Sequence, residues 1–209
     1  MGAIFRREVR SYFTSPIGYI FLAAFYAYAG IMFANYSLES GYTKLDSVFS
    51  ALLIIIIVLI PILTMRTISE EKRTKTDQCL LTAPVGLGSI VVGKFLAAFL
   101  IYIIAIAITG VFAVVVSAFG TPDWNVVVGN IVALALVGGA YIAIGIFCSS
   151  FTENQIVAAV ISFIALIFVS FLSTIGNLLP FDWLTTVCEK VSFGERYYSF
   201  TYGLFDFSN

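Results

Sequence analysis

The sequence predicts an all-α integral membrane protein, and three observations support this class. Of the 209 residues, 60% are apolar and 11% are charged, whereas a soluble domain is typically ~45–50% apolar and ~25% charged. The mean hydropathy is +1.02. Five long stretches contain no Asp, Glu, Lys or Arg. The chain therefore has too few charges to cover a water-soluble globule, and it has too much apolar surface to be disordered.

The five charge-free stretches are residues 17–38, 47–65, 95–122, 124–152 and 154–181. Each is long enough to cross a ~30 Å hydrocarbon core, which takes ~20 helical residues. Helices are expected because backbone groups in lipid must bond within their own segment, and strands of this length are not expected. We predict a single transmembrane domain over 1–209, with spans at about 17–37, 47–66, 90–119, 125–149 and 154–176.

Several kinds of functional site are excluded by composition. The chain has no histidine, which removes histidine acid–base chemistry and histidine metal ligands. Its three cysteines show no CxxC spacing, and its net charge of −1 does not favour nucleic acid. No GxxxxGK[ST] motif is present, so the chain lacks a P-loop. We expect no enzyme activity, no catalytic residue, no metal and no cofactor in this chain.

The charges flanking the spans predict an orientation. One side would hold the N-terminus, the 66–94 connection and Glu153, with eight basic and five acidic residues. The other side has three basic and seven acidic residues. The positive-inside rule therefore places the N-terminus in the cytoplasm of a multi-pass plasma-membrane protein. Five spans leave the C-terminus outside, and we expect a sixth span to follow Asn209.

The N-terminal segment, residues 1–15, is amphipathic. Apolar residues recur at helical spacing, and the arginines lie towards the polar side. We predict an interfacial helix on the cytoplasmic leaflet that ends before Pro16. Its candidate interface residues are Phe5, Arg6, Arg10 and Phe13. The alternative is a membrane-proximal tail that only enforces topology.

The connection at 66–94 holds eight of the 23 charged residues in the chain. Thr76 is suited to cap a short helix at 77–83, with Asp77 in its first turn and Leu80 and Leu81 on an apolar face. Pro84 would end this helix. A short amphipathic helix of this kind can dock into the groove of a soluble partner. The alternative is a solvated charged loop lying on lipid headgroups.

Two segments resemble a known family. They are FRREVRSYFTSPIGYIFLAAF at 5–25 and SEEKRTKTDQCLLTAPVGLGSIVVGKF at 69–95. The chain resembles the membrane permease of type-two ABC exporters, the ABC-2 type transporter family, in its gliding-motility-like branch. The resemblance runs from residue 5 to about 203. Lys75 stands where the family pattern has glycine, so the turn there is expected to differ. The matching positions in the second segment are Glu71, Lys72, Thr76, Leu80, Leu81, Thr82, Pro84, Gly93 and Lys94.

The resemblance implies a fold of six spans, of which five are present, with an external re-entrant helical hairpin at 177–209. It also implies a coupling helix in the 66–94 connection that sits in a groove of a separate ABC ATPase subunit. Two ATPases and a second permease, the same or homologous, would complete the complex. ATP and magnesium would bind the ATPase. The implied partner-binding residues are Glu70, Glu71, Lys72, Thr76, Asp77, Leu80, Leu81, Thr82 and Pro84.

The implied function is the permease subunit of an ATP-driven exporter. An ATPase-linked membrane anchor that transmits force is an alternative. An ATP-independent secondary transporter is disfavoured because the spans contain no charge for ion coupling. Substitution of Glu71 or Leu80 is expected to uncouple transport without unfolding the spans. Small residues from Gly138 to Gly145 predict a helix-packing face instead of a substrate site.

Overall fold

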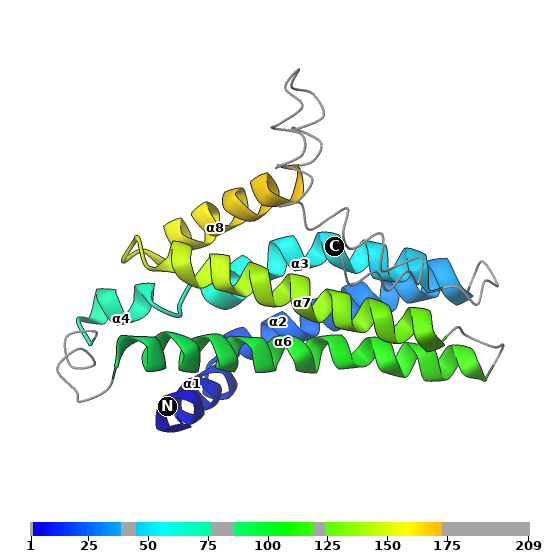
Figure 1. Ribbon diagram of the computed structural model, residues 1–209, viewed down its shortest axis with the longest axis horizontal. Coiled ribbons are helices and arrows are strands. Elements are labelled where there is room, and N and C mark those ends of the chain that lie inside the picture. Colours follow the sequence, from blue (N-terminus) through cyan, green and yellow to red (C-terminus); the bar gives the residue numbers. More distant parts are fainter. Residues whose placement is uncertain (1, 39–44, 77–85, 119–123, 173–209) are drawn as a thin grey trace, which may run out of the picture.

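The computed structural model describes residues 2–38, 45–76, 86–118 and 124–172, and every secondary-structure element in these ranges is a helix. Figure 1 shows their arrangement. The elements are α1 (Gly2–Thr14), α2 (Pro16–Phe33), the π-helical turn η1 (Ala34–Leu38), α3 (Asp46–Thr64), α4 (Ser69–Thr74), α6 (Leu87–Ser117), α7 (Trp124–Ser149) and α8 (Gln155–Ser170).

Four helical segments are long and apolar enough to cross a membrane. They are Pro16–Ser37, Ser47–Thr74, Leu87–Ser117 and Trp124–Ser149. The protein is therefore a multi-pass membrane protein. The predicted fifth span at 154–176 coincides in part with α8, a shorter apolar helix of 16 residues. The last residues of that span, the predicted helix at 77–83 and the predicted hairpin at 177–209 lie outside the described residues.

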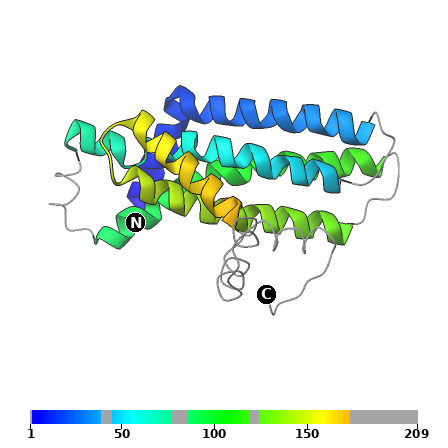
Figure 2. The same ribbon diagram turned by 90° about the horizontal axis from the view of Figure 1, so that it is seen from above.

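The core forms between the four long helices, which pack side by side. In Figure 2, α2, α3, α6 and α7 run along the long axis of the molecule. Helix α6 packs against α7 and α2, and α3 packs against α2, α7 and α8. Tyr102 of α6 is fully buried and its hydroxyl donates to the Leu134 carbonyl at 2.7 Å. The Tyr102 ring lies over Gly138 of α7, and Gly145 faces Thr64 of α3. The predicted small-residue face of α7 is therefore a packing face.

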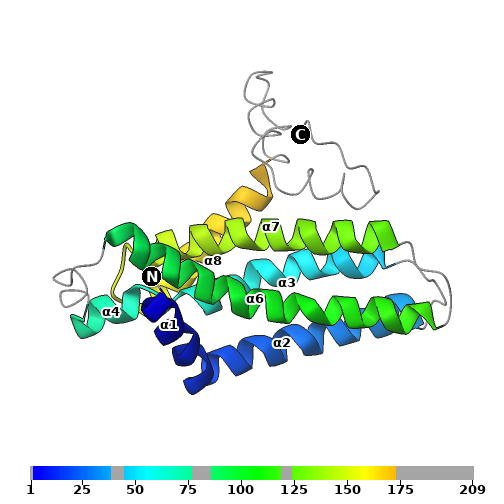
Figure 3. The same cartoon turned by 60° about the horizontal axis from the view of Figure 1, so that its bottom comes forward.

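One end of the bundle gathers the charge. Figure 3 shows α1, α4 and the first turns of α6 at that end. The turn between α7 and α8 also lies there, because Ser149 bonds to the start of α4. Every lysine and arginine in the described residues belongs to these segments or to the turns on either side of α4, which hold Arg66 and Lys75. We call this region the charged end.

The connection predicted at 66–94 is partly helical. Helix α4 occupies Ser69–Thr74, and α6 begins at Leu87. Helix α6 is 31 residues long, about 46 Å at 1.5 Å per residue, which exceeds the ~30 Å core. Its first turns, up to Lys94, can therefore extend beyond the apolar layer and meet α1 and α4.

Candidate functional site

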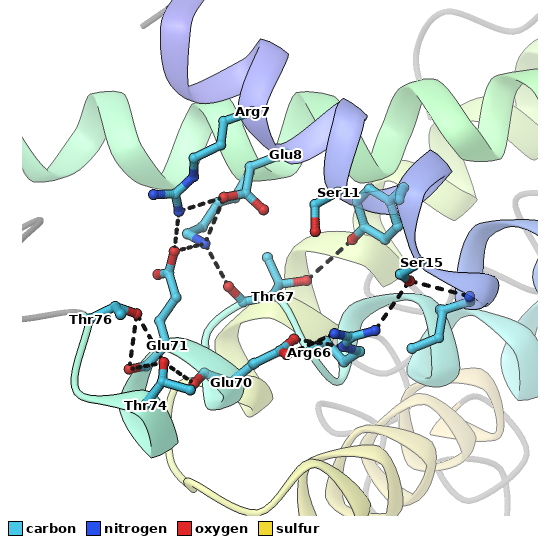
Figure 4. Close-up of a pocket in the computed structure, with 13 residues that line it drawn as sticks. Arg7, Glu8, Ser11, Ser15, Arg66, Thr67, Glu70, Glu71, Thr74 and Thr76 are labelled. Atoms are coloured by element: carbon cyan, nitrogen blue, oxygen red, sulfur yellow. Dashed lines mark hydrogen bonds and ion pairs between the residues drawn. The ribbon is translucent and has the colours of Figure 1, made fainter.

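A pocket of about 390 Å³ lies at the charged end, between α1, α4 and α6. Figure 4 shows side chains from these helices, and from the short turn after α3, converging on it. Three cations and three carboxylates line it, together with five Ser and Thr residues and Tyr12. The charged residues are Arg7, Glu8, Arg66, Glu70, Glu71 and Lys94.

Four of these charges form a closed cycle, which we call the ionic ring: Arg7, Glu8, Glu71 and Lys94. Lys94 Nζ lies 2.9 Å from Glu71 Oε1 and 3.3 Å from Glu8 Oε1. Arg7 Nη2 lies 2.5 Å from the same Glu71 oxygen and 3.0 Å from the same Glu8 oxygen. Each anion thus contacts two cations, and each cation contacts two anions. The ionic ring joins α1, α4 and α6, which are far apart in sequence.

Lys94 is the buried member of the ionic ring. Its side chain is 2% exposed, whereas Arg7 is 55% exposed. Lys94 Nζ donates hydrogen bonds to the Thr67 carbonyl at 2.6 Å and to Glu8 Oε1, and Glu71 is its second ion-pair partner. An isolated ammonium in such a place would be costly, but a paired and hydrogen-bonded one is tolerated. Lys94 therefore has its charge balanced inside the protein by Glu8 and Glu71.

A second ion pair ties the start of α4 to the start of α2. Arg66 donates a bidentate pair of hydrogen bonds to the Glu70 carboxylate, at 2.6 Å from Nε to Oε2 and 2.7 Å from Nη2 to Oε1. Arg66 Nη1 also donates to Ser15 Oγ at 3.1 Å. Ser15 is the N-cap of α2 and accepts from the Ile17 amide. A displacement of α4 would therefore also reach the beginning of the first span.

Tyr12 adds an uncharged link between α1 and α3. It is 9% exposed, and its hydroxyl donates to the Leu63 carbonyl at 3.1 Å. Burial raises the pKa of Tyr12 to about 12, so this hydroxyl stays protonated and remains a donor at physiological pH. Near the other end of α1, the helix crosses α6 at Gly93, where an added Cβ would come within 3.2 Å of Ile4.

The end of α7 supports α4 from the other side. Ser149 Oγ accepts from the amides of Ile68 and Ser69, each at 3.2 Å, and donates to the Met65 carbonyl. These two amides are among those that a helix N-terminus leaves without an intrahelical partner. Lys72 Nζ donates to the Ser150 carbonyl. Helix α4 is thus bonded to α1, α6 and the α7–α8 turn together.

Helix α4 ends in a Schellman motif. The Thr76 amide bonds to the Glu71 carbonyl at 3.0 Å, and the Lys75 amide bonds to the Lys72 carbonyl at 3.1 Å. Lys75 has φ 57° and ψ 22°, the left-handed conformation that favours glycine. Lys75 stands where the family pattern has glycine. It therefore adopts the left-handed backbone conformation that glycine adopts most easily.

We expect Lys75→Gly to stabilise the end of α4 by about 1 kcal/mol, because a side chain in the left-handed region costs roughly that much. Hydrogen exchange of the 69–76 amides, measured by mass spectrometry in detergent, should slow. Lys75→Ala is the matched control, since it removes the charge but keeps Cβ, and it should bring no gain. Equal protection in the two variants would contradict this account.

Three of the predicted partner-binding residues hold α4 in place through polar contacts. Glu71 belongs to the ionic ring, Glu70 pairs with Arg66, and Lys72 bonds to the α7–α8 turn. Thr76 Oγ1 contacts the Glu71 carbonyl and Thr74 Oγ1. On α1, Phe5 packs against the core, Arg6 and Arg10 are exposed, and Phe13 is 37% exposed. Asp77, Leu80, Leu81, Thr82 and Pro84 lie outside the described residues.

Sequence reasoning did not assign Lys94 a role as the centre of a polar cluster, although it matched the family pattern. It also missed Arg7, Glu8, Arg66 and Ser149 as members of the site. A signal for Lys94 and Glu8 was present: Lys94 is a lone cation between apolar runs, and Glu8 is a lone acid in a basic segment. Each pattern indicates a charge that needs a buried partner, but neither says which one.

Comparison with protein families gives one match over most of the chain. Residues 3–185 match the family described as ABC-2 family transporter protein. No curated protein and no solved structure matches the chain. Members of this family are typically non-catalytic membrane subunits that work with an ATPase partner. The family match and the four apolar helices agree, and this chain belongs to the ABC-2 family of transporter membrane proteins.

Proposed function

We propose that this chain is the permease subunit of an ATP-driven exporter of the gliding-motility-like branch, and that a separate ATPase subunit docks on its 66–94 connection. The observation that carries the proposal is the set of ion pairs and hydrogen bonds that join α4 to the neighbouring helices. Helix α4 directly precedes the predicted coupling helix at 77–83. Its side chains and backbone bond to α1, α6 and the end of α7, and Glu70 holds Arg66, which bonds to Ser15 at the start of α2.

The attachments of α4 suggest how motion would pass through the protein. ATP binding would close the ATPase dimer and displace the docked helix at 77–83. Helix α4 would move with it, because the Schellman turn that ends α4 at Lys75 and Thr76 directly precedes the segment predicted to form that helix. The ionic ring would carry the displacement into α1 and the first turns of α6, and the Arg66–Ser15 bond would carry it into α2. A ligand biases an equilibrium only through differential affinity, and this end is where the bias would enter.

The charge distribution supports a cytoplasmic placement of this end, since all described lysines and arginines lie there. The proposed complex has two ATPase subunits, which bind ATP and magnesium, and a second permease subunit, in the plasma membrane. A fifth span beginning with α8, a sixth span and an external hairpin complete the proposed permease.

The test is co-purification from mild detergent of the tagged chain with its ATPase. We expect Leu80→Asp to abolish recovery of the ATPase, because a carboxylate would be buried in the groove that receives an apolar anchor. Leu80→Met is the matched control, and it should retain the ATPase. The ATPase is identified by mass spectrometry and by ATP hydrolysis in the eluate.

Two results would overturn the proposal. In the first, the chain purifies without an ATPase although it keeps its fold. In the second, Leu80→Asp and Leu80→Met retain the ATPase equally. ATP-dependent flux in proteoliposomes then separates export from force transmission: a complex that hydrolyses ATP and moves no cargo would favour the membrane-anchor alternative.

A further inference from the structure

The outward face of α1 carries a second feature that the proposed coupling does not use. Arg6, Arg10 and Phe13 are spaced i, i+4 and i+7, so they share one side of the helix. All three are exposed, whereas Glu8 and Tyr12 on the opposite side face α6 and α3. Helix α1 thus turns its acid and its tyrosine inward and turns two arginines outward.

The charges of this outward face are not neutralised within the described residues. The one carboxylate of α1, Glu8, is engaged by Lys94 and Arg7, and Glu71 is engaged by the same two cations. Glu70 is held by Arg66. In the described part of the chain, Arg6 and Arg10 have no ion pair at 4.0 Å or less. The outward face therefore presents two positive charges to whatever lies beside it.

An exposed aromatic pair indicates where this face lies relative to the membrane surface. Phe13, 37% exposed, and Tyr19 at the start of α2, 56% exposed, meet edge to face with ring centroids 6.1 Å apart. They stand on either side of the α1–α2 junction, where the first membrane-spanning segment begins. Aromatic side chains concentrate at the level of the lipid headgroups. Arg6 and Arg10 lie on the same side of α1 as Phe13, so a helix with Phe13 at headgroup level would bring both arginines near the phosphates.

We propose that the outward face of α1, formed by Arg6, Arg10 and Phe13, binds anionic phospholipid headgroups. The arginines supply charge complementarity to the phosphates of an anionic leaflet, and Phe13 with Tyr19 inserts at the boundary of the acyl chains. The proposal rests on the membrane placement of the chain and not on the ATPase, so it can hold even if the Leu80 experiment fails.

The experiment uses the full chain with one reporter tryptophan. Phe13→Trp is introduced with Trp124→Phe and Trp183→Phe, and the protein is reconstituted into phosphatidylcholine nanodiscs. Brominated phosphatidylglycerol or brominated phosphatidylcholine is then added at equal mole fraction, and quenching of the tryptophan is measured. We expect stronger quenching by the anionic lipid, with a preference that weakens as salt is raised.

Removal of the arginines should abolish the preference. We expect Arg6→Gln and Arg10→Gln each to lower the ratio of anionic to zwitterionic lipid at this site by about fivefold. The matched control is Arg73→Gln with Lys75→Gln, which removes two exposed cations from the end of α4. It should leave the ratio unchanged. Elution volume and thermal midpoint in detergent verify that each variant is folded.

Equal quenching by the two lipids, or a preference that survives loss of both arginines, overturns the proposal. So does a third result, in which neither lipid quenches the reporter and the arginine variants lose the ATPase. That outcome assigns the outward face of α1 to the protein partner instead of the membrane.

Discussion

Lys94→Met is expected to lower the free energy of unfolding by about 3–5 kcal/mol, the range for removing one partner of a buried ion pair. The methionine has no charge, so the carboxylates of Glu8 and Glu71 would face each other with only Arg7 between them. The Thr67 carbonyl would also lose the donor that reaches it at 2.6 Å. Denaturant titration in mixed micelles, or the thermal midpoint in detergent, measures the loss.

Two controls separate this effect from loss of any lysine. Lys75→Met makes the same chemical change at an exposed position, and it should alter stability by no more than ~0.5 kcal/mol. The variant with Glu8→Gln, Glu71→Gln and Lys94→Met together should recover much of the stability, because a neutral, packed substitute for a buried ion set is often tolerated. A Lys94→Met protein as stable as the parent would refute the ionic ring as a buried, mutually dependent set.

This result also bears on how coupling variants are chosen. Glu71 was expected to uncouple transport without unfolding the spans, but its carboxylate contacts both cations of the ionic ring. A Glu71 variant will therefore combine a local loss of stability with any loss of coupling. Leu80→Asp is the better probe of coupling, and its stability should be measured beside its activity.

Gly138→Ala is expected to destabilise the packing of α6 on α7 by about 1–3 kcal/mol, the usual cost of overfilling a core. The added Cβ would lie 2.1 Å from two carbons of the Tyr102 ring and 2.4 Å from its hydroxyl. The ring has little freedom to retreat, since Tyr102 is fully buried and its hydroxyl is bonded to the Leu134 carbonyl. The thermal midpoint in detergent reports the change.

Gly110→Ala is the matched control, because it makes the same substitution inside α6 at a position with no atom within 4 Å of the new Cβ. It should stabilise the protein by about 0.5–1 kcal/mol through helix propensity. The opposite signs of the two variants are the expected outcome. Similar stabilisation by both would mean that Gly138 does not lie in a close helix contact.

The sequence alone determined the class of the protein and the approximate location of its described spans. Charge-free runs of about 20 residues can be satisfied in lipid only as helices, so length and composition are sufficient. The small residues from Gly138 to Gly145 likewise indicated a packing face, because small side chains let helices approach closely. The family resemblance was also visible in the sequence, and the match over 3–185 supports its ABC-2 part.

Only the tertiary structure decided which charges meet. The ionic ring is formed by residues from three separate helices: Arg7 and Glu8 from α1, Glu71 from α4 and Lys94 from α6. The sequence shows that these charges exist, but it does not show which of them pair. The sequence also did not reveal which side of each span faces the core. The lipid-facing side and the core-facing side are both apolar, so the helical periodicity of apolar and polar residues is absent. The orientation of α1 followed from the same packing: burial of Glu8 beside Lys94 is what turns Arg6 and Arg10 outward.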